Sequence, residues 1–168
     1  SDKIEISNPA LLSMVLANDT KIENGGNLLG DPTETSLIQY AFDKHIDVSK
    51  LLEKYKRVQE VPFDSDRKLM STVNKDGDKY YVAVKGAPDE LMKRVKYVSE
   101  KGQIKPITED EKKKILITNQ EMAKKALRVL GLAYKIVDKL YEDPSTDNVE
   151  QDLIFVGLVG MIDPERPE

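Results

Sequence analysis

The sequence contains no cysteine among its 168 residues. This absence excludes a disulfide framework, a thiolate metal site and a cysteine nucleophile. No apolar run approaches the roughly 20 residues that a helix needs to cross a bilayer, and residues 1–19 lack the basic and apolar regions of a signal peptide. We therefore expect a folded domain that is not itself inserted in a membrane.

Several phosphate- and metal-binding motifs are also missing. There is no GxxxxGK[ST] loop and no GxGxxG after an expected strand, so phosphates are not held in either of these two ways. The single histidine, His45, falls on the apolar face of an expected helix, where a core or boundary position is favoured over a metal ligand. Acidic pairs such as Glu109-Asp110 are typical of solvated surface. We predict no catalytic and no metal-binding residue.

The composition indicates one globular domain. Hydrophobic residues make up 39% and charged residues 33% of the chain, a balance that supports a folded core. Lys and Arg number 26 against 30 Asp and Glu, a net charge of −4. This balance argues against a nucleic-acid partner, and an anionic ligand would need a local basic pocket.

The first third of the chain predicts three helices. Asn8 and Asp31 are suitable N-caps, each followed by a proline at the first helical position. After Asp31, apolar residues recur at helical spacing through Leu37, Ile38, Ala41, Phe42 and His45. A more polar helix is expected at about 48–56.

The remainder predicts strands interrupted by two helices. Strands are expected at 57–63, on both sides of an Asp76-Gly77 hairpin turn within 69–86, at 128–137 and, centrally in the sheet, at 152–162. Helices are expected from 88 to about 95 and after a Thr108/Glu111 capping box. The order predicts an α+β fold, an antiparallel β-sheet flanked by helices.

Five segments carry a family resemblance in their order and spacing. They are GDPTET at 30–35, PFDSDRKLMS at 62–71, VKGAP at 84–88, LRVLGLA at 127–133 and GMIDPERP at 160–167. Each is weak alone, because capped helix starts, strand ends and turns give similar strings. Together they resemble the nucleotide-binding (N) domain of P-type cation-transporting ATPases, in particular of calcium pumps and their bacterial relatives, over essentially the whole chain.

The chemistry of these residues agrees with a nucleotide pocket. Phe63 can stack under a purine. Lys85 alternates onto the strand face of Tyr81, and the adjacent Gly86 permits close approach of a ligand. Arg128 and Leu130 are two apart and so share a face, placing a phosphate-binding fork beside an apolar side chain.

The resemblance assigns further residues to the pocket. It implies that the positions matching Glu34, Phe63, Lys68, Lys85, Arg128 and Leu130 line the nucleotide site. In this assignment Lys68 adds a second positive charge and Glu34 accepts from the adenine amino group. Animal reticulum calcium pumps have an arginine where this chain has Ser65. Arg67 is expected to face away from the pocket, because a shift of one residue on a strand reverses the side chain.

The resemblance also implies how the activity is divided between domains. Residues 1–162 would form the nucleotide-binding domain, and 163–168 would begin the hinge to a phosphorylation domain. The phosphorylated aspartate of the family lies in a DKTGT segment, which this sequence lacks, and the Mg²⁺ site belongs mainly to that other domain. We therefore expect a monomer that binds ATP without turning it over.

In the parent pump, the expected partners are the phosphorylation and actuator domains of the same chain. The expected location is the cytoplasmic side of a membrane, the plasma membrane in a bacterium. Calcium as the transported ion is implied by the resemblance alone. Two other functions stay open: a protein-interaction or regulatory module, and a small self-sufficient phosphatase or kinase.

Overall fold

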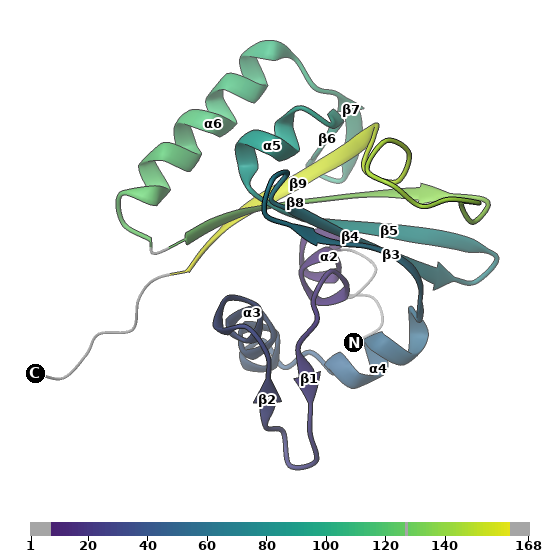
Figure 1. The fold of residues 1–168 in the computed structure, drawn as a ribbon. Coiled ribbons are helices and arrows are strands. Elements are labelled where there is room, and N and C mark those ends of the chain that lie inside the picture. The colour runs from purple at the N-terminus through teal and green to yellow at the C-terminus, as the bar shows by residue number, and fades with distance from the viewer. Residues whose placement is uncertain (1–7, 127, 162–168) are drawn as a thin grey trace, which may run out of the picture.

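A seven-stranded sheet runs through the centre of the computed structural model, which describes residues 8–126 and 128–161 (Figure 1). Its strand order is β3-β4-β5-β8-β9-β6-β7. The strands are β3 (Arg57–Asp64), β4 (Leu69–Asp76), β5 (Lys79–Gly86), β6 (Val95–Glu100), β7 (Gln103–Pro106), β8 (Arg128–Val137) and β9 (Leu153–Met161). Neighbours are antiparallel except β6 and β9, which are parallel. The predicted α+β fold is confirmed.

Helices cover both faces of this sheet, as Figure 1 shows. One face carries α2 (Pro9–Leu16), α3 (Pro32–Asp43) and α4 (Val48–Lys54), and the other carries α5 (Pro88–Met92) and α6 (Glu109–Ala123). A separate two-stranded ladder, β1 (Lys21–Ile22) with β2 (Leu28–Leu29), precedes α3. In the described part of the chain, no helix is both long and apolar enough to span a membrane.

The predicted helix caps are confirmed. The Asn8 side chain accepts from the backbone N–H of Leu11, and the Asp31 side chain accepts from that of Thr33. The reciprocal capping box of Thr108 and Glu111 opens α6. These bonds satisfy N–H groups that a helix start leaves without an intrahelical partner.

The alternation of β5 distributes its side chains between two cores. Tyr81 and Ala83 pack with α2, α3 and α4, whereas Val82 and Val84 pack with Leu91 of α5. Because a strand places successive side chains on opposite faces, one apolar strand serves both layers. The sheet is therefore the middle of a three-layer domain.

The prediction for His45 was wrong. Helix α3 ends at Asp43, and His45 is exposed with a positive φ of 62°. The Ile46 N–H bonds to the Ala41 carbonyl across this left-handed turn, a bond typical of a Schellman helix end. Ile46, not His45, then packs against the apolar core.

The sequence reading also missed the hairpin of β6 and β7. The helix expected to run to about Val95 ends at Met92, and Val95 already begins β6. Lys101 and Gly102 form the hairpin turn, both with positive φ, at 52° and 79°. A glycine-containing turn between two short strands was the signal that could have predicted it.

Candidate functional site

One hollow brings together six of the seven predicted site residues. It lies between the start of α3 and the strands β3, β5 and β8, with a volume of about 200 Å³. The predicted residues that line it are Glu34, Phe63, Lys85, Gly86, Arg128 and Leu130. Four further lining residues were not predicted: Asp19, Asp31, Thr33 and Met70. Segments far apart in the sequence therefore build one site.

Lys85 and Glu34 form the electrostatic centre of this hollow. Lys85 Nζ lies 2.7 Å from Glu34 Oε2, and their side chains are 6% and 14% exposed. Burial lowers the pKa of the Lys85 ammonium below its ordinary value, although the adjacent Glu34 carboxylate acts in the opposite direction. Glu34 Oε2 also accepts from the backbone N–H of Asp19 at 3.2 Å. The carboxylate is thus held at the first turn of α3.

Phe63 presents its ring to the hollow from the edge strand β3, where it is 58% exposed. Val61, two residues earlier, belongs to the core on the opposite side of the sheet, beneath α5 and α6. Regular alternation would place both side chains on one face. Val61 pairs with Ser71 and Asp64 with Leu69, and this register shift changes the direction of the strand at Phe63.

Gly86 has a packing role independent of any ligand. A Cβ atom at this position would overlap the Lys68 carbonyl oxygen and would lie 2.8 Å from Cα of Leu69. The predicted reason for Gly86 was close approach of a ligand. The described contacts show that the turn between β3 and β4 already occupies this space, so a side chain is excluded there.

Arg128 and Leu130 line the hollow from the start of β8. They pair with Met161 and Val159 of β9, respectively, in the antiparallel ladder. Leu130 is largely buried and packs with Met14 of α2. An apolar wall and a guanidinium group therefore come from one strand face, as the two-residue spacing predicted.

Lys68 and its neighbours in the β3–β4 turn, Ser65 and Arg67, do not line the hollow. Lys68 is exposed, has a positive φ of 58° and is not among the residues that line the hollow. Ser65 is exposed in the same turn. Arg67 bonds instead to the fully buried carboxylate of Glu150. The structure does not place Lys68 with the other six predicted residues.

The acidic residues of the hollow were missed by sequence reasoning. The sequence pattern predicts only a helix cap at Asp31, which it is, and no motif points to Asp19. The Asp19 carboxylate forms an ion pair with Arg57 at 2.7 Å. Because Asp19 and Asp31 also line the hollow, its two cations, Lys85 and Arg128, share it with three carboxylates, those of Asp19, Asp31 and Glu34.

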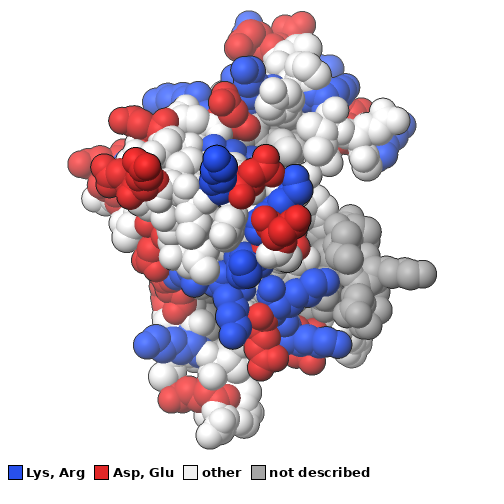
Figure 2. Space-filling view, turned by 90° about the vertical axis from the view of Figure 1, so that its right-hand side faces the viewer, with Lys and Arg blue, Asp and Glu red and all other residues white. Residues whose placement is uncertain are grey.

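Figure 2 shows acidic and basic side chains intermixed over the face that lies to the right in Figure 1. Charges arranged in this way produce no strong field of one sign at a distance. Within the hollow itself, Lys85 and Arg128 are the two cations that an anionic ligand would meet.

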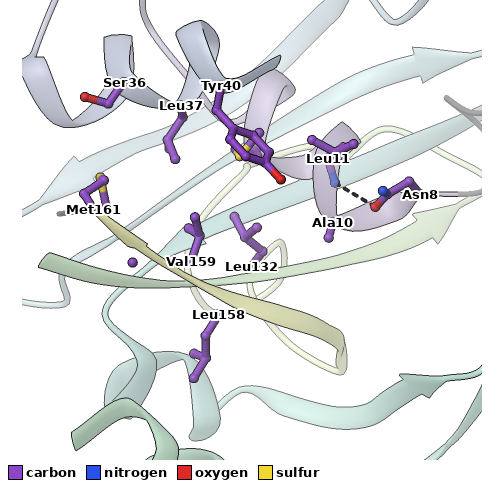
Figure 3. Close-up of a pocket in the computed structure, with 12 residues that line it drawn as sticks. Asn8, Ala10, Leu11, Ser36, Leu37, Tyr40, Leu132, Leu158, Val159 and Met161 are labelled. Atoms are coloured by element: carbon purple, nitrogen blue, oxygen red, sulfur yellow. Dashed lines mark hydrogen bonds between the residues drawn. The ribbon is translucent and has the colours of Figure 1, made fainter. Parts of the chain in front are cut away.

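A larger hollow of about 500 Å³ lies between α2, α3 and β8–β9 (Figure 3). Apolar side chains such as Leu37, Leu132 and Val159 dominate it, with polar groups from Asn8, Ser36 and Tyr40. Its lining residues include no Lys, Arg, Asp or Glu. An anionic ligand is therefore better matched by the smaller hollow.

Comparison with known proteins identifies the family. Residues 8–168 match the family described as P-type ATPase, cytoplasmic domain N. The chain belongs to this family. The N domain is 42% identical over 152 residues to a calcium-transporting ATPase of Listeria monocytogenes, covering 90% of this chain and 17% of that protein.

Two other relatives give similar values. A calcium-transporting ATPase of Lactococcus lactis is 45% identical over 157 residues, covering 93% of this chain and 18% of that protein. One of Bacillus cereus is 42% identical over 158 residues, covering 94% and 18%. The N domain therefore spans less than a fifth of the length of these relatives.

The N domain has suitable groups for a nucleotide but shows no cluster for a metal. Within residues 8–126 and 128–161, no group of three or more His, Cys, Asp or Glu side chains is arranged to hold a metal ion. The hollow contains an exposed aromatic ring, two cations and an apolar wall. This donor set fits a base and phosphates.

Proposed function

We propose that this N domain binds the adenosine part of ATP in the hollow formed by Phe63, Lys85, Gly86, Arg128 and Leu130. In the parent chain it would present the γ-phosphate to an aspartate of the phosphorylation domain and so drive cation transport, with calcium as the proposed ion. The observation that carries this proposal is the convergence of an exposed ring and two cations in one hollow.

Each part of the hollow has a proposed role. Phe63 supplies a face for the purine, while the buried Leu130 beside it excludes water. Arg128 offers donors to phosphate oxygens, and a guanidinium can do so through two parallel bonds. Lys85 supplies a cationic wall beside the base. Glu34, whose carboxylate is already oriented by Lys85 and the Asp19 N–H, can accept from the adenine amino group.

The chemistry of phosphoryl transfer is proposed to lie outside this N domain. The sequence has no DKTGT segment, so the domain would contribute positioning of ATP rather than bond making. Mg²⁺ would be held mainly by the phosphorylation domain. We propose that domain closure, with the actuator domain of the same chain, takes place on the cytoplasmic side of a membrane, the plasma membrane in a bacterium.

An NMR titration of the N domain with ATP, AMP and GTP tests the proposal. Amide resonances of Phe63, Lys85, Gly86 and Leu130 should shift with ATP and with AMP. Resonances at Ile104, on the far edge strand β7, should not. A comparison of ATP with GTP, which differ only in the base, measures base selectivity.

If none of these amides shifted at millimolar ATP, the nucleotide proposal would be wrong. A protein-interaction module would then be the better function, with the exposed Phe63 ring as part of a contact surface. Loss of ATP-induced shifts in Phe63→Ala and in Lys85→Ala, with the remaining spectrum unchanged, would support nucleotide binding at this hollow.

A further inference from the structure

The hydrogen-bonded ladder of the sheet restrains the backbone at Phe63 only weakly. β3 is an edge strand, with β4 as its only neighbour in the described sheet. Between the pairs Val61–Ser71 and Asp64–Leu69, two residues of β3 lie opposite one residue of β4. This is the arrangement of a β-bulge, in which the ladder is locally disrupted. Something other than β4 must therefore fix the direction of Phe63.

The Arg67 side chain bonds to the backbone of this bulge. Its Nη2 donates to the Pro62 carbonyl at 2.9 Å and to the Val61 carbonyl at 3.3 Å. These are the two residues immediately before Phe63. The guanidinium thus restrains the peptide units that determine where the ring points.

Glu150 holds the guanidinium in place. Arg67 Nε and Nη2 donate to its two carboxylate oxygens at 2.8 Å and 2.9 Å, and the side chains are 12% and 0% exposed. A two-point bond of this kind fixes the plane of the guanidinium as well as its position. A fully buried carboxylate has no alternative partner in water, so the pair stays formed.

The segment that carries Glu150 is anchored at several other points. This β8–β9 loop, residues 138–152, receives two bonds from Lys135 Nζ, at the carbonyls of Asn148 and Gln151, each at 2.9 Å. Gln59 of β3 also pairs with both the N–H and the carbonyl of Tyr141. The loop therefore contacts β3 directly at Gln59 and, through Arg67, at the bulge.

We propose that Arg67 and Glu150 are positioning residues for nucleotide binding, which act by holding the β3 bulge so that the Phe63 ring faces the hollow. That the ligand is a nucleotide rests on the function proposed above. Neither residue lines the hollow, so their effect on binding passes through Phe63.

The test compares Arg67→Met/Glu150→Leu with the unmodified N domain. Changing both partners leaves no unpaired buried charge but removes the donors to the Val61 and Pro62 carbonyls. Arg67→Lys keeps a charge beside Glu150 and loses the planar fork. Lys79→Gln/Asp138→Asn is the matched control, because it removes an exposed ion pair between β5 and the same loop. Urea unfolding verifies that each variant is folded.

Affinity for AMP is measured in each variant, alone and combined with Phe63→Ala. The paired variant and Arg67→Lys should bind AMP about three- to thirtyfold more weakly, and the control pair should bind as the unmodified domain does. In the Phe63→Ala background the same changes should alter affinity by less than about twofold. An equal loss in both backgrounds, or unchanged affinity in a folded paired variant, would overturn the proposal.

A second measurement separates this inference from the nucleotide proposal. The chain contains three phenylalanines, so 4-fluorophenylalanine gives three ¹⁹F signals, and Phe63→Ala assigns one of them. Without nucleotide, the paired variant should shift or broaden the Phe63 signal alone, and the control should not. If the unmodified domain bound no nucleotide, the nucleotide proposal would fail, yet this signal would still show whether the pair positions Phe63. An unchanged signal would overturn that role.

Discussion

The ammonium group of Lys85 lies 2.7 Å from the Glu34 carboxylate, and both side chains are largely shielded from water. Burial disfavours the charged lysine, while the carboxylate favours it. An incoming nucleotide would therefore meet a cation that already has a partner. Binding of ATP should depend on how much charge Lys85 retains.

Replacing Lys85 tests this dependence on charge. Lys85→Met should weaken ATP binding by about 1.5–3 kcal/mol, the usual range for a bond to a charged group. In the unmodified domain, ATP affinity should fall as pH rises toward 10.5. The pKa of the Lys85 ammonium lies below this ordinary value, so the group loses its proton and its charge in this range. Calorimetric titrations across this range measure both effects. Lys85→Arg, which stays charged, should bind ATP without this decline, and a decline of equal size would contradict the role of Lys85.

The same residue gives a prediction for stability against pH. Between the lowered pKa of folded Lys85 and 10.5, the unfolded chain binds a proton that the folded domain does not. The free energy of unfolding should therefore rise with pH in this window, relative to Lys85→Met. Urea unfolding of both proteins at several alkaline pH values measures the difference. A relative fall with rising pH would contradict the direction of the shift.

Replacing Phe63 tests the stacking face. Phe63→Ala should weaken AMP binding by about 1–3 kcal/mol, because the base would lose its aromatic partner. The ring is 58% exposed, so the free energy of unfolding should change by less than about 0.5 kcal/mol. Calorimetry and urea unfolding measure the two quantities. Phe63→Tyr is the matched control and should keep most of the affinity, and undiminished binding in Phe63→Ala would contradict stacking.

At the scale of elements, the stability of α6 depends largely on its own termini and surface residues, because little of the helix is buried. None of its described residues is buried, and Ile115 and Leu116 contact the core only in part. Its first turn is fixed by the reciprocal bonds of Thr108 and Glu111. Local stability of this helix should therefore be sensitive to its cap.

Thr108→Ala should destabilise α6 by about 0.5–2 kcal/mol, because the N–H of Glu111 would lose its acceptor. Amide hydrogen exchange within 109–123 measures this loss, and exchange in β4 and β5 should change much less. The control is Thr118→Ala on the same helix, whose hydroxyl donates only to the Lys114 carbonyl in the preceding turn. Equal acceleration in both variants would show that the capping box is not the cause.

At the scale of the whole molecule, the hollow joins parts that fold together. Glu34 comes from α3, Phe63 from the edge strand and Arg128 from the interior strand β8. A ligand that contacts all three stabilises only the assembled domain, so binding and unfolding are linked. The linkage can be measured with the N domain alone.

ATP at about 100 times its dissociation constant should raise the free energy of unfolding by about 2.7 kcal/mol. Urea unfolding with and without ATP measures this increase, and the dissociation constant comes from the NMR titration. Phe63→Ala at the same ATP concentration should gain less. Phosphate release with Mg²⁺ should stay at background, because the sequence has no DKTGT aspartate. Turnover proportional to the amount of N domain would favour a self-sufficient hydrolase instead.

The sequence alone determined the features that depend on local chemistry. Caps at Asn8, Asp31 and Thr108 and the hairpin at Asp76-Gly77 follow from side chains that bond to nearby backbone or permit a turn. Strand alternation also placed Lys85 on the face of Tyr81. In each case the deciding contacts lie within a few residues of one another. The hinge predicted at 163–168 lies outside the described residues and stays a prediction.

Only the tertiary structure decided which distant groups meet. The pair of Arg67 with Glu150 and the parallel pairing of β6 with β9 join segments separated by many residues. No local pattern specifies these contacts, because each depends on how the layers pack around the sheet. The sequence identified six of the ten residues that line the hollow, and packing determined their partners and the direction in which Phe63 points.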